Sequence, residues 1–573
     1  MKKVFILVFS FSASLLFSQT NLHLSNPVAK NILKGNFDPS AYQPAFPVSN
    51  PNFIIQNINA NVSADSLKSY LERLDDFETR NTGSDTLSAS RGIGAARAYI
   101  HQKFAQFSNF QNGRLITSYF SFDQDICGMM RHKNVLGILP GSDTINKDII
   151  IIEGHFDSRC ETSCDTACAA HGMEDNGSGT ALVIELARVM SFYSFKQTLV
   201  FMATTGEEQG LLGARAFADF LTQENISVEA VLNNDVIGGV ICGQTSSAPS
   251  CPGKDLIDST QVRLFSGGGY NSTNKCLTRF IKLQYLDELI STVNVPMLVT
   301  LMTSEDRTGR GGDHIPFRQN NIPAIRFTSA HEHGNAGVGP NYHDRQHTSD
   351  DILGVDTDND NVLDSFYVDF NYLARNAVIN GAAITALALG PEQPDYTITP
   401  VNGDLEIVVN DPYSYGTYKV GFRTTGWDFD TLMTFTGSSA ILNPGLTGNA
   451  FVSLMAVDNN NIESLANKEQ AIFKISIDEN ELSGNEFILL QNKPNPFDES
   501  TAIGFYVPTE KSKQAVIKIT SLDGRVIKEL ETEVSKGMNE VIYDHGYGIE
   551  GNFVYSLYVD GALIGSKKMT FIY

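Results

Sequence analysis

The chain has 573 residues, which is too long for one domain and suggests about three or four. Hydrophobic residues make up 42% of the sequence, so the chain can form a sizeable core, as ordinary globular proteins do. The formal net charge of −23 argues against a nucleic-acid-binding function, because phosphate binding needs clustered lysine and arginine side chains.

The N-terminus has the organisation of a secretory signal peptide. Lys2 and Lys3 precede an apolar run over residues 4–17, and small or polar residues follow at 18–20. Because this run is too short to span a bilayer comfortably, we expect residues 1–19 to be a signal peptide. Later in the sequence no stretch approaches the roughly 18 consecutive apolar residues of a membrane span. We therefore expect an exported protein without a stable membrane span.

The seven cysteines suit an exported chain, in which disulfides can form. Cys160, Cys164 and Cys168 lie in one short segment. Such spacing is also found in zinc knots, although no fourth ligand at knot spacing is evident. Because the total is odd, at least one thiol stays unpaired or pairs with another chain.

Residues 20–62 are rich in Asn, Pro and Ser, and their weak periodicity predicts an irregular N-terminal arm. From residue 63 the pattern predicts amphipathic helices at 64–77 and 95–107. Strands are predicted at 134–139, 148–153, 198–203, 230–232, 297–302 and 322–328, with helices at 179–190 and about 365–389. This alternation predicts a three-layer α/β sandwich with a mostly parallel mixed sheet over residues 63–390.

The helical period disappears after a linker at residues 390–394. Short alternating strands at 405–409, 418–422 and 450–456 predict a small β-sandwich over 395–478, similar to a fibronectin type III or immunoglobulin-like module. A second small all-β sandwich is predicted over 486–573, because strands alternate there with Gly and Asp turns.

Polar residues follow the predicted strands of the α/β unit at the points where those strands end. They are His155, Asp157, Glu174, Asp175, Glu207, Glu208, Asp235, His343 and His347. Because ligands in open α/β sheets gather beyond the carboxyl ends of the strands, these side chains are expected to lie together. A lone His-x-Asp pair or two adjacent glutamates would be structural or solvated. The whole set, however, supplies the imidazole and carboxylate donors of a zinc-type metal centre.

These segments resemble the zinc aminopeptidase family, metallopeptidase family twenty-eight, over roughly residues 63–390. The matching segments are 154–158, 175–179, 206–213, 234–238 and 347–351. The resemblance implies a zinc exopeptidase fold that holds two zinc ions bridged by Asp175. One ion would be completed by His155 and Asp235, and the other by Glu208 and His347. Co²⁺ or Mn²⁺ could take the place of zinc.

The chemistry implied by the resemblance follows from charge. Two Zn²⁺ and the three ligand carboxylates leave a net charge of about +1, which can hold a hydroxide formed from a water with a pKa near ~7. Glu207 would take the proton from that water as general base and pass it to the leaving amine. Asp157 would orient the imidazole of His155, because alternation in an extended segment places both side chains on one face.

Other histidines near these motifs leave alternatives. His343 competes with His347 for the last ligand position, and the 347–351 motif favours His347. Asp313 and His314 resemble a family segment that lines the site, with either a structural or a substrate-side role. His331 and His333, a bare His-x-His, are expected to be loop residues rather than ligands.

A calcium site is a further possibility in the acidic segment Asp356, Asp358, Asp360 and Asp364. These residues resemble the first part of a calcium-binding loop. The sequence lacks the glycine of the sixth position, however, and Tyr367 stands where the bidentate glutamate belongs. An acidic lead-in to the following helix is the simpler interpretation.

Residues 486–573 resemble the C-terminal sorting domain of the type IX secretion system. The matching segments are 489–497, with its Pro-Asn-Pro-Phe sequence, 501–505, 522–525 and 567–573. The resemblance implies a Gram-negative bacterium, secretion to the medium or the cell surface, and the secretion machinery as a partner. A carbohydrate-binding β module is the alternative.

The ligand set predicts an exported di-zinc exopeptidase, foremost an aminopeptidase that acts on the N-termini of peptides or proteins. A carboxypeptidase or dipeptidase of the same family stays open, because the metal ligands do not determine which terminus is held. A glutaminyl cyclase of related fold would use one zinc, whereas both metal positions have their ligands here. An inactive adhesin would have lost a ligand or Glu207, and neither is lost.

Overall fold

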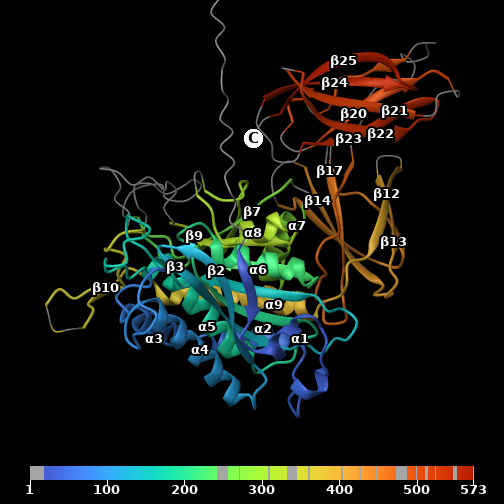
Figure 1. Cartoon of the computed structure of the whole chain (residues 1–573). Coiled ribbons are helices and arrows are strands. Elements are labelled where there is room, and N and C mark those ends of the chain that lie inside the picture. The colour runs from blue at the N-terminus through green and yellow to red at the C-terminus, as the bar shows by residue number, and fades with distance from the viewer. Residues whose placement is uncertain are drawn as a thin grey trace, which may run out of the picture.

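The computed structural model describes most of the chain in three units (Figure 1). The described residues are 19–241, 256–269, 272–307, 310–331, 345–358, 360, 362–401, 404–424, 428–445, 450–472, 487–493, 495–497, 500–509, 514–522, 524–545 and 551–571. All but the last residue of the expected signal peptide lie outside these ranges, as do Cys242, Cys251, His333 and His343.

The first unit contains a nine-stranded mixed sheet with the strand order β1-β2-β3-β5-β4-β6-β9-β7-β8. Its parallel pairs are β4 with β5, β4 with β6, β6 with β9, and β7 with β8, whereas the remaining pairs are antiparallel. The strands are β1 (Thr20–Leu24), β2 (Ile116–Ile126), β3 (Met129–Leu139), β4 (Ile149–His155), β5 (Thr198–Thr204), β6 (Val228–Asn234), β7 (Gln261–Ser266), β8 (Leu298–Leu301) and β9 (Ala324–Ser329).

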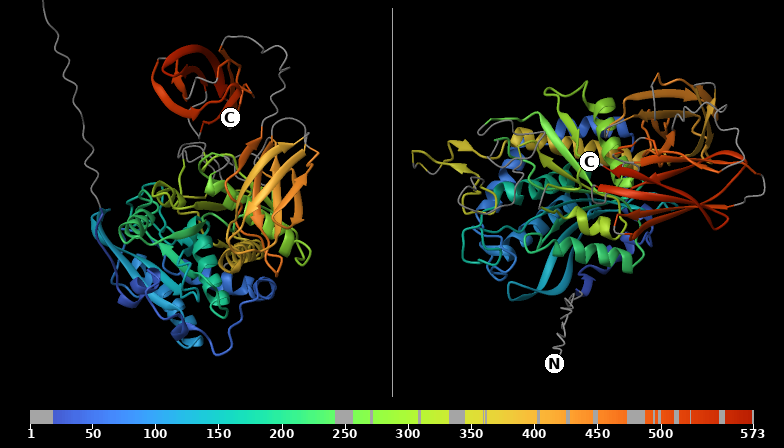
Figure 2. Two further views of the ribbon diagram at one scale, coloured as in Figure 1. Left: turned by 90° about the vertical axis from the view of Figure 1, so that its right-hand side faces the viewer. Right: turned by 90° about the horizontal axis from the view of Figure 1, so that it is seen from above.

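Helices cover both faces of this sheet and make a three-layer sandwich (Figures 1 and 2). The helices are α1 (Pro27–Leu33), α2 (Pro51–Asn61), α3 (Ala64–Asp75), α4 (Gly92–Phe110), α5 (Ser178–Met190), α6 (Leu212–Gln223), α7 (Thr273–Gln284), α8 (His314–Gln319) and α9 (Phe370–Leu389). Strand β4 shows why the layers form. Ile150 and Ile152 join the core under α2–α5, α7 and α9, whereas Ile149 and Ile151 join the core under α1, α6 and α8. Because successive side chains of a strand point to opposite faces, the run of four isoleucines is buried on both.

The expectation of an irregular arm over residues 20–62 is wrong. Strand β1 pairs antiparallel with β2 at the edge of the sheet, and helices α1 and α2 follow it. Part of the Asn- and Pro-rich composition on which that expectation rested comes from helix starts. The side chains of Asn26 and Asn50 accept hydrogen bonds from the first turns of α1 and α2, and each helix opens with a proline. Ile54, Ile55 and Ile58 then bury α2 in the core.

The last helix of this unit begins later than the sequence indicates. Residues 365–366 pair with β10 (Gly354–Val355) as the short strand β11 (Ser365–Phe366), and α9 starts at Phe370. Asp369 decides this boundary because its side chain accepts a hydrogen bond from the backbone N–H of Tyr372.

The second unit is a β-sandwich that packs beside the first (Figure 2). Its two sheets have the orders β12-β13-β16 and β15-β14-β17-β18. The strands are β12 (Asp395–Val401), β13 (Asp404–Asn410), β14 (Thr417–Arg423), β15 (Thr431–Thr436), β16 (Ser439–Leu442), β17 (Ala450–Ala456) and β18 (Gln470–Ile472). Every pairing within these sheets is antiparallel.

A buried ionic cluster joins this sandwich to α7 of the first unit. The carboxylate of Glu469 accepts from Arg423 Nη2 at 2.7 Å and lies 3.3 Å from Arg279 Nη2. All three side chains are at most 1% exposed. Separating the two units would leave Arg279 without this carboxylate, whereas Arg423 and Glu469 would stay paired within the sandwich. The buried contact of Arg279 with Glu469 therefore favours one relative position of the units.

The third unit is also all β, and its core contains only residues of 489–571. Its sheets have the orders β19-β20-β23 and β22-β21-β24-β25. The strands are β19 (Ile488–Leu489), β20 (Ser500–Val507), β21 (Gln514–Ser521), β22 (Val526–Glu533), β23 (Gly537–Asp544), β24 (Gly551–Val559) and β25 (Ala562–Phe571). In Figure 1 this unit lies at the top, apart from the α/β unit below it.

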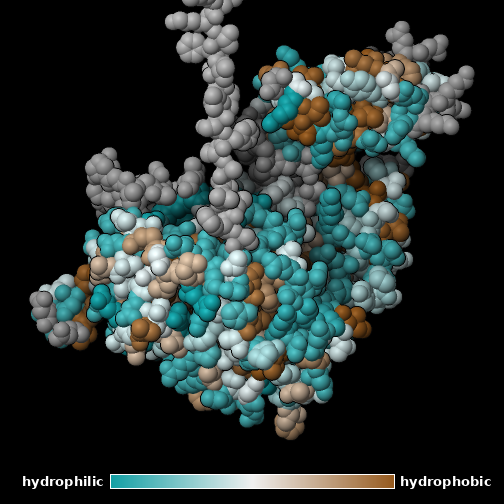
Figure 3. All heavy atoms as spheres, in the orientation of Figure 1, coloured by the Kyte–Doolittle hydropathy of each residue, from teal (hydrophilic) through white to brown (hydrophobic). Residues whose placement is uncertain are grey.

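The face of the molecule in Figure 3 is mainly hydrophilic, with hydrophobic residues scattered over it. Among the residues that the structure describes, no helix combines the length and the apolar character needed to cross a membrane.

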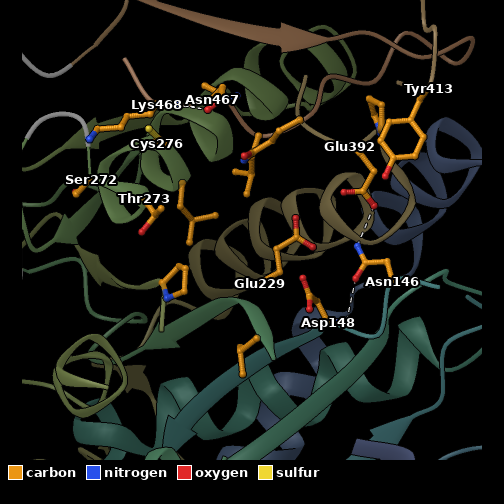
Figure 4. Close-up of a pocket in the computed structure, with 17 residues that line it drawn as sticks. Asn146, Asp148, Glu229, Ser272, Thr273, Cys276, Glu392, Tyr413, Asn467 and Lys468 are labelled. Carbon is orange, nitrogen blue, oxygen red and sulfur yellow. Dashed lines mark hydrogen bonds between the residues drawn. The ribbon is translucent and has the colours of Figure 1, made fainter. Parts of the chain in front are cut away.

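A cavity of about 730 Å³ lies where the first two units meet (Figure 4). Three carboxylates line it, those of Asp148, Glu229 and Glu392. Burial, together with the carboxylates of Asp148 and Glu392, raises the pKa of Glu229 to about 7, although a hydrogen bond from Gln197 acts in the opposite direction.

This raised pKa predicts a pH-dependent loss of stability. Because the folded protein holds the Glu229 proton up to about pH 7 and the unfolded chain only to about 4.5, the free energy of unfolding falls as the pH rises between these values. Glu229→Gln removes that loss and should stabilise the protein by roughly 1–3 kcal/mol at pH 8, with little effect at pH 4. Urea unfolding at both pH values measures the difference. The exposed Glu72→Gln is the control, and equal changes for the two variants would contradict the prediction.

Candidate metal centre

Six side chains meet at the carboxyl ends of the central parallel strands. His155 is the last residue of β4, Glu207 and Glu208 follow β5, and Asp235 follows β6. Asp175 lies in the turn Met173–Gly177 before α5, and His347 lies in the segment 345–351. The sheet topology therefore brings together residues that are up to 192 positions apart, as open α/β sheets generally do at this edge.

The carboxylate of Asp175 lies between the two histidines. Its Oδ1 is 3.2 Å from His155 Nε2, and its Oδ2 is 2.9 Å from His347 Nε2. Asp235 Oδ1 lies 3.5 Å from the same nitrogen of His155, and Glu208 Oε2 lies 3.2 Å from that of His347. Each histidine thus faces one oxygen of Asp175 and one further carboxylate.

These groups form two clusters. Within each cluster the donor atoms lie within 4.8 Å of one another. One contains His155, Glu207 and Asp235, and the other Asp175, Glu208 and His347. Asp175 also contacts His155, so its carboxylate lies in a bridging position. The mixture of imidazole and carboxylate donors suits zinc and similar divalent cations.

The electrostatics of these side chains also fit bound cations. Burial would lower the pKa of His347, but the carboxylates of Glu208 and Asp175 outweigh it and raise the pKa to about 9. Burial, with the charges of Asp235 and Glu208, raises the pKa of Glu207 well above its usual range. Within the described part of the chain, Glu208 Oε1 is buried without a hydrogen-bond partner. Protons would therefore balance the carboxylates in the metal-free protein, and divalent cations can replace them.

Residues on both sides of His347 hold Asp175 in place. The carboxylate of Asp351 accepts from the backbone N–H groups of Glu174 at 2.9 Å and Asp175 at 3.0 Å. Gln346 Nε2 donates to Asp175 Oδ2 at 2.6 Å. The Asp at the end of the 347–351 motif therefore positions a donor group on a different loop.

Asp157 contacts both His155 and the turn of the adjacent glutamates. Its Oδ1 is 3.6 Å from His155 Nδ1, and its backbone carbonyl is closer, at 3.1 Å. The carboxylate accepts from the backbone N–H groups of Glu207 at 3.4 Å and Glu208 at 3.3 Å. Thr82 donates its hydroxyl to the same carboxylate at 3.0 Å. Asp157 thus orients the imidazole mainly through its main chain, while its side chain orients the two glutamates.

Asp313 and His314 lie behind these donor groups and are almost fully buried. Asp313 accepts a hydrogen bond from Thr204, and burial raises its pKa to about 7. His314 Nε2 lies 3.0 Å from the carbonyl oxygen of Glu305. Neither residue is among those that line the cavity at the centre. This arrangement favours a supporting role over substrate contact.

The other histidine and aspartate candidates lie elsewhere. His331 is buried near Glu174 and Asp351 beside a cavity of about 50 Å³, and it belongs to neither donor cluster. Asp356, Asp358 and Asp360 do bring oxygens within 4.8 Å of one another on the surface. Asp364 instead accepts hydrogen bonds from Thr357, and Tyr367 stacks against Arg345.

Two buried charged residues near the centre escaped the sequence analysis. Arg80 donates to the carbonyl oxygens of Phe156 at 2.8 Å and Gly172 at 2.7 Å, and so ties together the loops that follow β4. Glu153 is fully buried in β4, and neither of its oxygens has a hydrogen-bond partner among the described residues. A charged residue directly after four isoleucines was a signal for Glu153, whereas nothing local distinguishes Arg80.

Two disulfides hold the segment that follows Arg159 of the cavity wall. Cys127 pairs with Cys164, and Cys160 pairs with Cys168. The three crowded cysteines are therefore not a zinc knot. Cys276 is buried and free, in agreement with the expected unpaired thiol.

Comparison with known proteins identifies the family. The model described as Peptidase family M28 matches residues 134–361, a range that contains all six side chains of the centre. A probable zinc metalloprotease of Leptosphaeria maculans is 30% identical over 394 residues, covering 65% of this chain and 87% of that protein. A probable zinc metalloprotease of Pyrenophora teres f. teres is 29% identical over 479 residues, covering 78% and 94%. The chain is thus a member of a metallopeptidase class, and it belongs to peptidase family M28.

Among solved structures, the Legionella pneumophila LapA aminopeptidase matches with a TM-score of 0.42 and 18% identity. The match covers 61% of this chain and 78% of that one. The family assignment rests on the sequence matches alone.

The position of Asp351 leads to a prediction about metal affinity. In Asp351→Asn, one of the two carboxylate oxygens becomes an NH2 group, which cannot accept a hydrogen bond. One of the two backbone N–H groups therefore loses its acceptor, and Asp175 loses part of its support. We expect the affinity for zinc to fall about 10–100-fold. Titration against a competing chelator measures it, with the neighbouring exposed Asp350→Asn as control. Equal affinities of the two variants would show that the Asp351 contacts do not support the centre.

Proposed function

We propose that the protein is an exported exopeptidase with two zinc ions, most specifically an aminopeptidase that removes N-terminal residues from peptides. The observation that carries the proposal is the position of Asp175, whose two oxygens face His155 and His347. Asp175 and the two histidines, together with Asp235 and Glu208, would hold the ions. When bound, zinc would activate a water and polarise the carbonyl of the scissile peptide bond.

Glu207 would carry the proton in this reaction. It lines the cavity of about 320 Å³ at the centre, next to Asp175, Glu208 and Asp235. From there its carboxylate can accept a proton from the attacking water and return it to the amine that leaves. The hydrogen bond from its backbone N–H to Asp157 fixes the turn on which it sits.

The dimensions of the site favour action at a chain end. A cavity of about 320 Å³ is near the lower limit of ligand sites and suits one or two residues rather than a long segment. A glutaminyl cyclase would need one zinc, whereas here two groups of donors share the carboxylate of Asp175, which supports two ions.

Export is part of the proposal. Two disulfides in the described residues suit an oxidising compartment. The third unit has a core of its own, as a separate C-terminal sorting module for type IX secretion would need. We propose that this unit directs the protein to the medium or surface of a Gram-negative bacterium, and that the α/β unit acts there.

The first test separates proton transfer from metal binding. Glu207→Gln keeps a side chain of the same shape without the titratable group, so activity on aminoacyl-anilides should fall about 10²–10⁴-fold. Metal analysis should still find two zinc ions in each chain. Exposed Glu161→Gln is the control. Equal activity of Glu207→Gln and wild type would refute the role of Glu207. If the wild type hydrolyses N-blocked substrates but no substrate with a free N-terminus, the aminopeptidase assignment is refuted.

A second test addresses the metals directly. Because buried carboxylates in the centre lose their counter-charges when zinc is removed, chelation should abolish hydrolysis and lower the unfolding temperature. Adding back zinc should restore both properties. The number of zinc ions per chain at which the recovery of activity saturates gives the number of ions in the centre. Saturation at one ion would exclude the two-zinc centre.

A further inference from the structure

The cavity at the centre has an unusual number of positive side chains. Arg159, Arg307 and Arg310 line it together with Glu207 and four of the five proposed metal ligands, which are Asp175, Glu208, Asp235 and His347. Arginines cannot lose their charge at ordinary pH, so each needs an acceptor or open water. The hydrogen-bond acceptors that the protein offers to each arginine therefore indicate which guanidinium group remains able to bind a substrate.

Two of the three arginines are already engaged with protein carboxylates. Arg159 Nε donates to Glu208 Oε2 at 2.8 Å. Arg307 Nε donates to its neighbour Asp306 at 3.2 Å. Asp306 also accepts two hydrogen bonds of 3.0 Å from Arg326, which in turn lies 3.2 Å from Asp235.

Arg310 differs from these two. Its Nε and Nη2 are buried, and within the described part of the chain neither has a hydrogen-bond partner. Its backbone N–H donates to the carbonyl of Arg307 at 3.1 Å, so the two residues lie close together, and both line the cavity. A buried charged donor without an acceptor costs free energy, and a ligand carboxylate would remove that cost.

The charge of the cavity wall points the same way. Its carboxylates are those of Asp175, Glu207, Glu208 and Asp235. If the proposed pair of divalent cations is bound, these four negative charges are neutralised and the arginines are left in excess. A positive cavity with a forked donor favours a planar carboxylate, which can accept two parallel hydrogen bonds.

We propose that Arg310, with the positive charge of Arg307 nearby, binds a carboxylate of the substrate and makes this peptidase selective for substrates that carry one beside the scissile bond. This inference rests on the proposed peptidase function. The carboxylate has two possible sources that share this chemistry. It is either an acidic side chain on the N-terminal residue or the free α-carboxylate of a dipeptide.

The test compares substrates that differ only in this charge. The full-length, zinc-loaded protein is assayed on glutamyl- and glutaminyl-anilide, and on the dipeptide Leu-Leu and its C-terminal amide. We expect a preference of tenfold to hundredfold in kcat/KM for the carboxylate of one pair, equivalent to roughly 1.4–2.8 kcal/mol. The pair that shows the preference identifies the source of the carboxylate.

Three variants then test whether Arg310 causes this preference. Arg310→Gln should bring the ratio within the responsive pair close to one, and Arg310→Lys should retain part of it because the charge remains without the fork. Arg91→Gln, which removes an exposed arginine paired with Glu78, should keep the wild-type ratio. A ratio near one in the wild type, or a preference that survives Arg310→Gln, overturns the proposal.

A binding measurement keeps this inference separate from the peptidase function. Calorimetry compares glutamate with glutamine, and leucine with leucinamide, on wild type and Arg310→Gln. Tighter binding of one carboxylate form by wild type, lost in the variant, supports the carboxylate site even if none of the peptides is hydrolysed. Equal binding within both pairs refutes the site, whereas absent hydrolysis refutes only the peptidase proposal.

Discussion

The crowding of negative charge at one edge of the central sheet is the constraint on which the rest of this structure depends. Asp175, Glu207, Glu208 and Asp235 converge there, around two histidines. Carboxylates placed so closely in a protein interior repel one another and lose their hydration. They are tolerable because cations can lie among them, and because neighbouring groups offset part of the charge, such as Gln346 beside Asp175 and Arg159 beside Glu208.

The contacts that fix these donor groups come from the surrounding strands and loops rather than from the donor groups themselves. Strand β4 is covered on both faces, so its carboxyl end is a rigid platform for His155. Arg80 ties the loops beyond it together, and Asp351 ties the segment of His347 to the turn of Asp175. Rigid support of this kind limits how far the donor atoms can relax apart when they carry no metal.

The two β units differ in how they are joined to this platform. The sandwich shares the buried cluster of Glu469, Arg423 and Arg279 with α7, so it behaves as part of the peptidase body. The third unit has a core of its own residues. The sandwich is therefore joined to the α/β unit by a buried ion pair, whereas the core of the third unit is formed by its own residues alone.

The sequence by itself determined the class of fold and the identities of the metal-binding candidates. Four consecutive isoleucines mark a strand buried on both faces, and the histidine and carboxylates follow such strands in regular order. It misjudged residues 20–62, because a proline after an asparagine marks a helix start as readily as a loop. Only the tertiary structure decided that Asp351 supports Asp175, and that Arg310 lines the cavity with two guanidinium nitrogens that have no acceptor among the described residues. Those relations join loops more than 70 residues apart, and no local pattern of residues encodes which side chains will meet across such a distance.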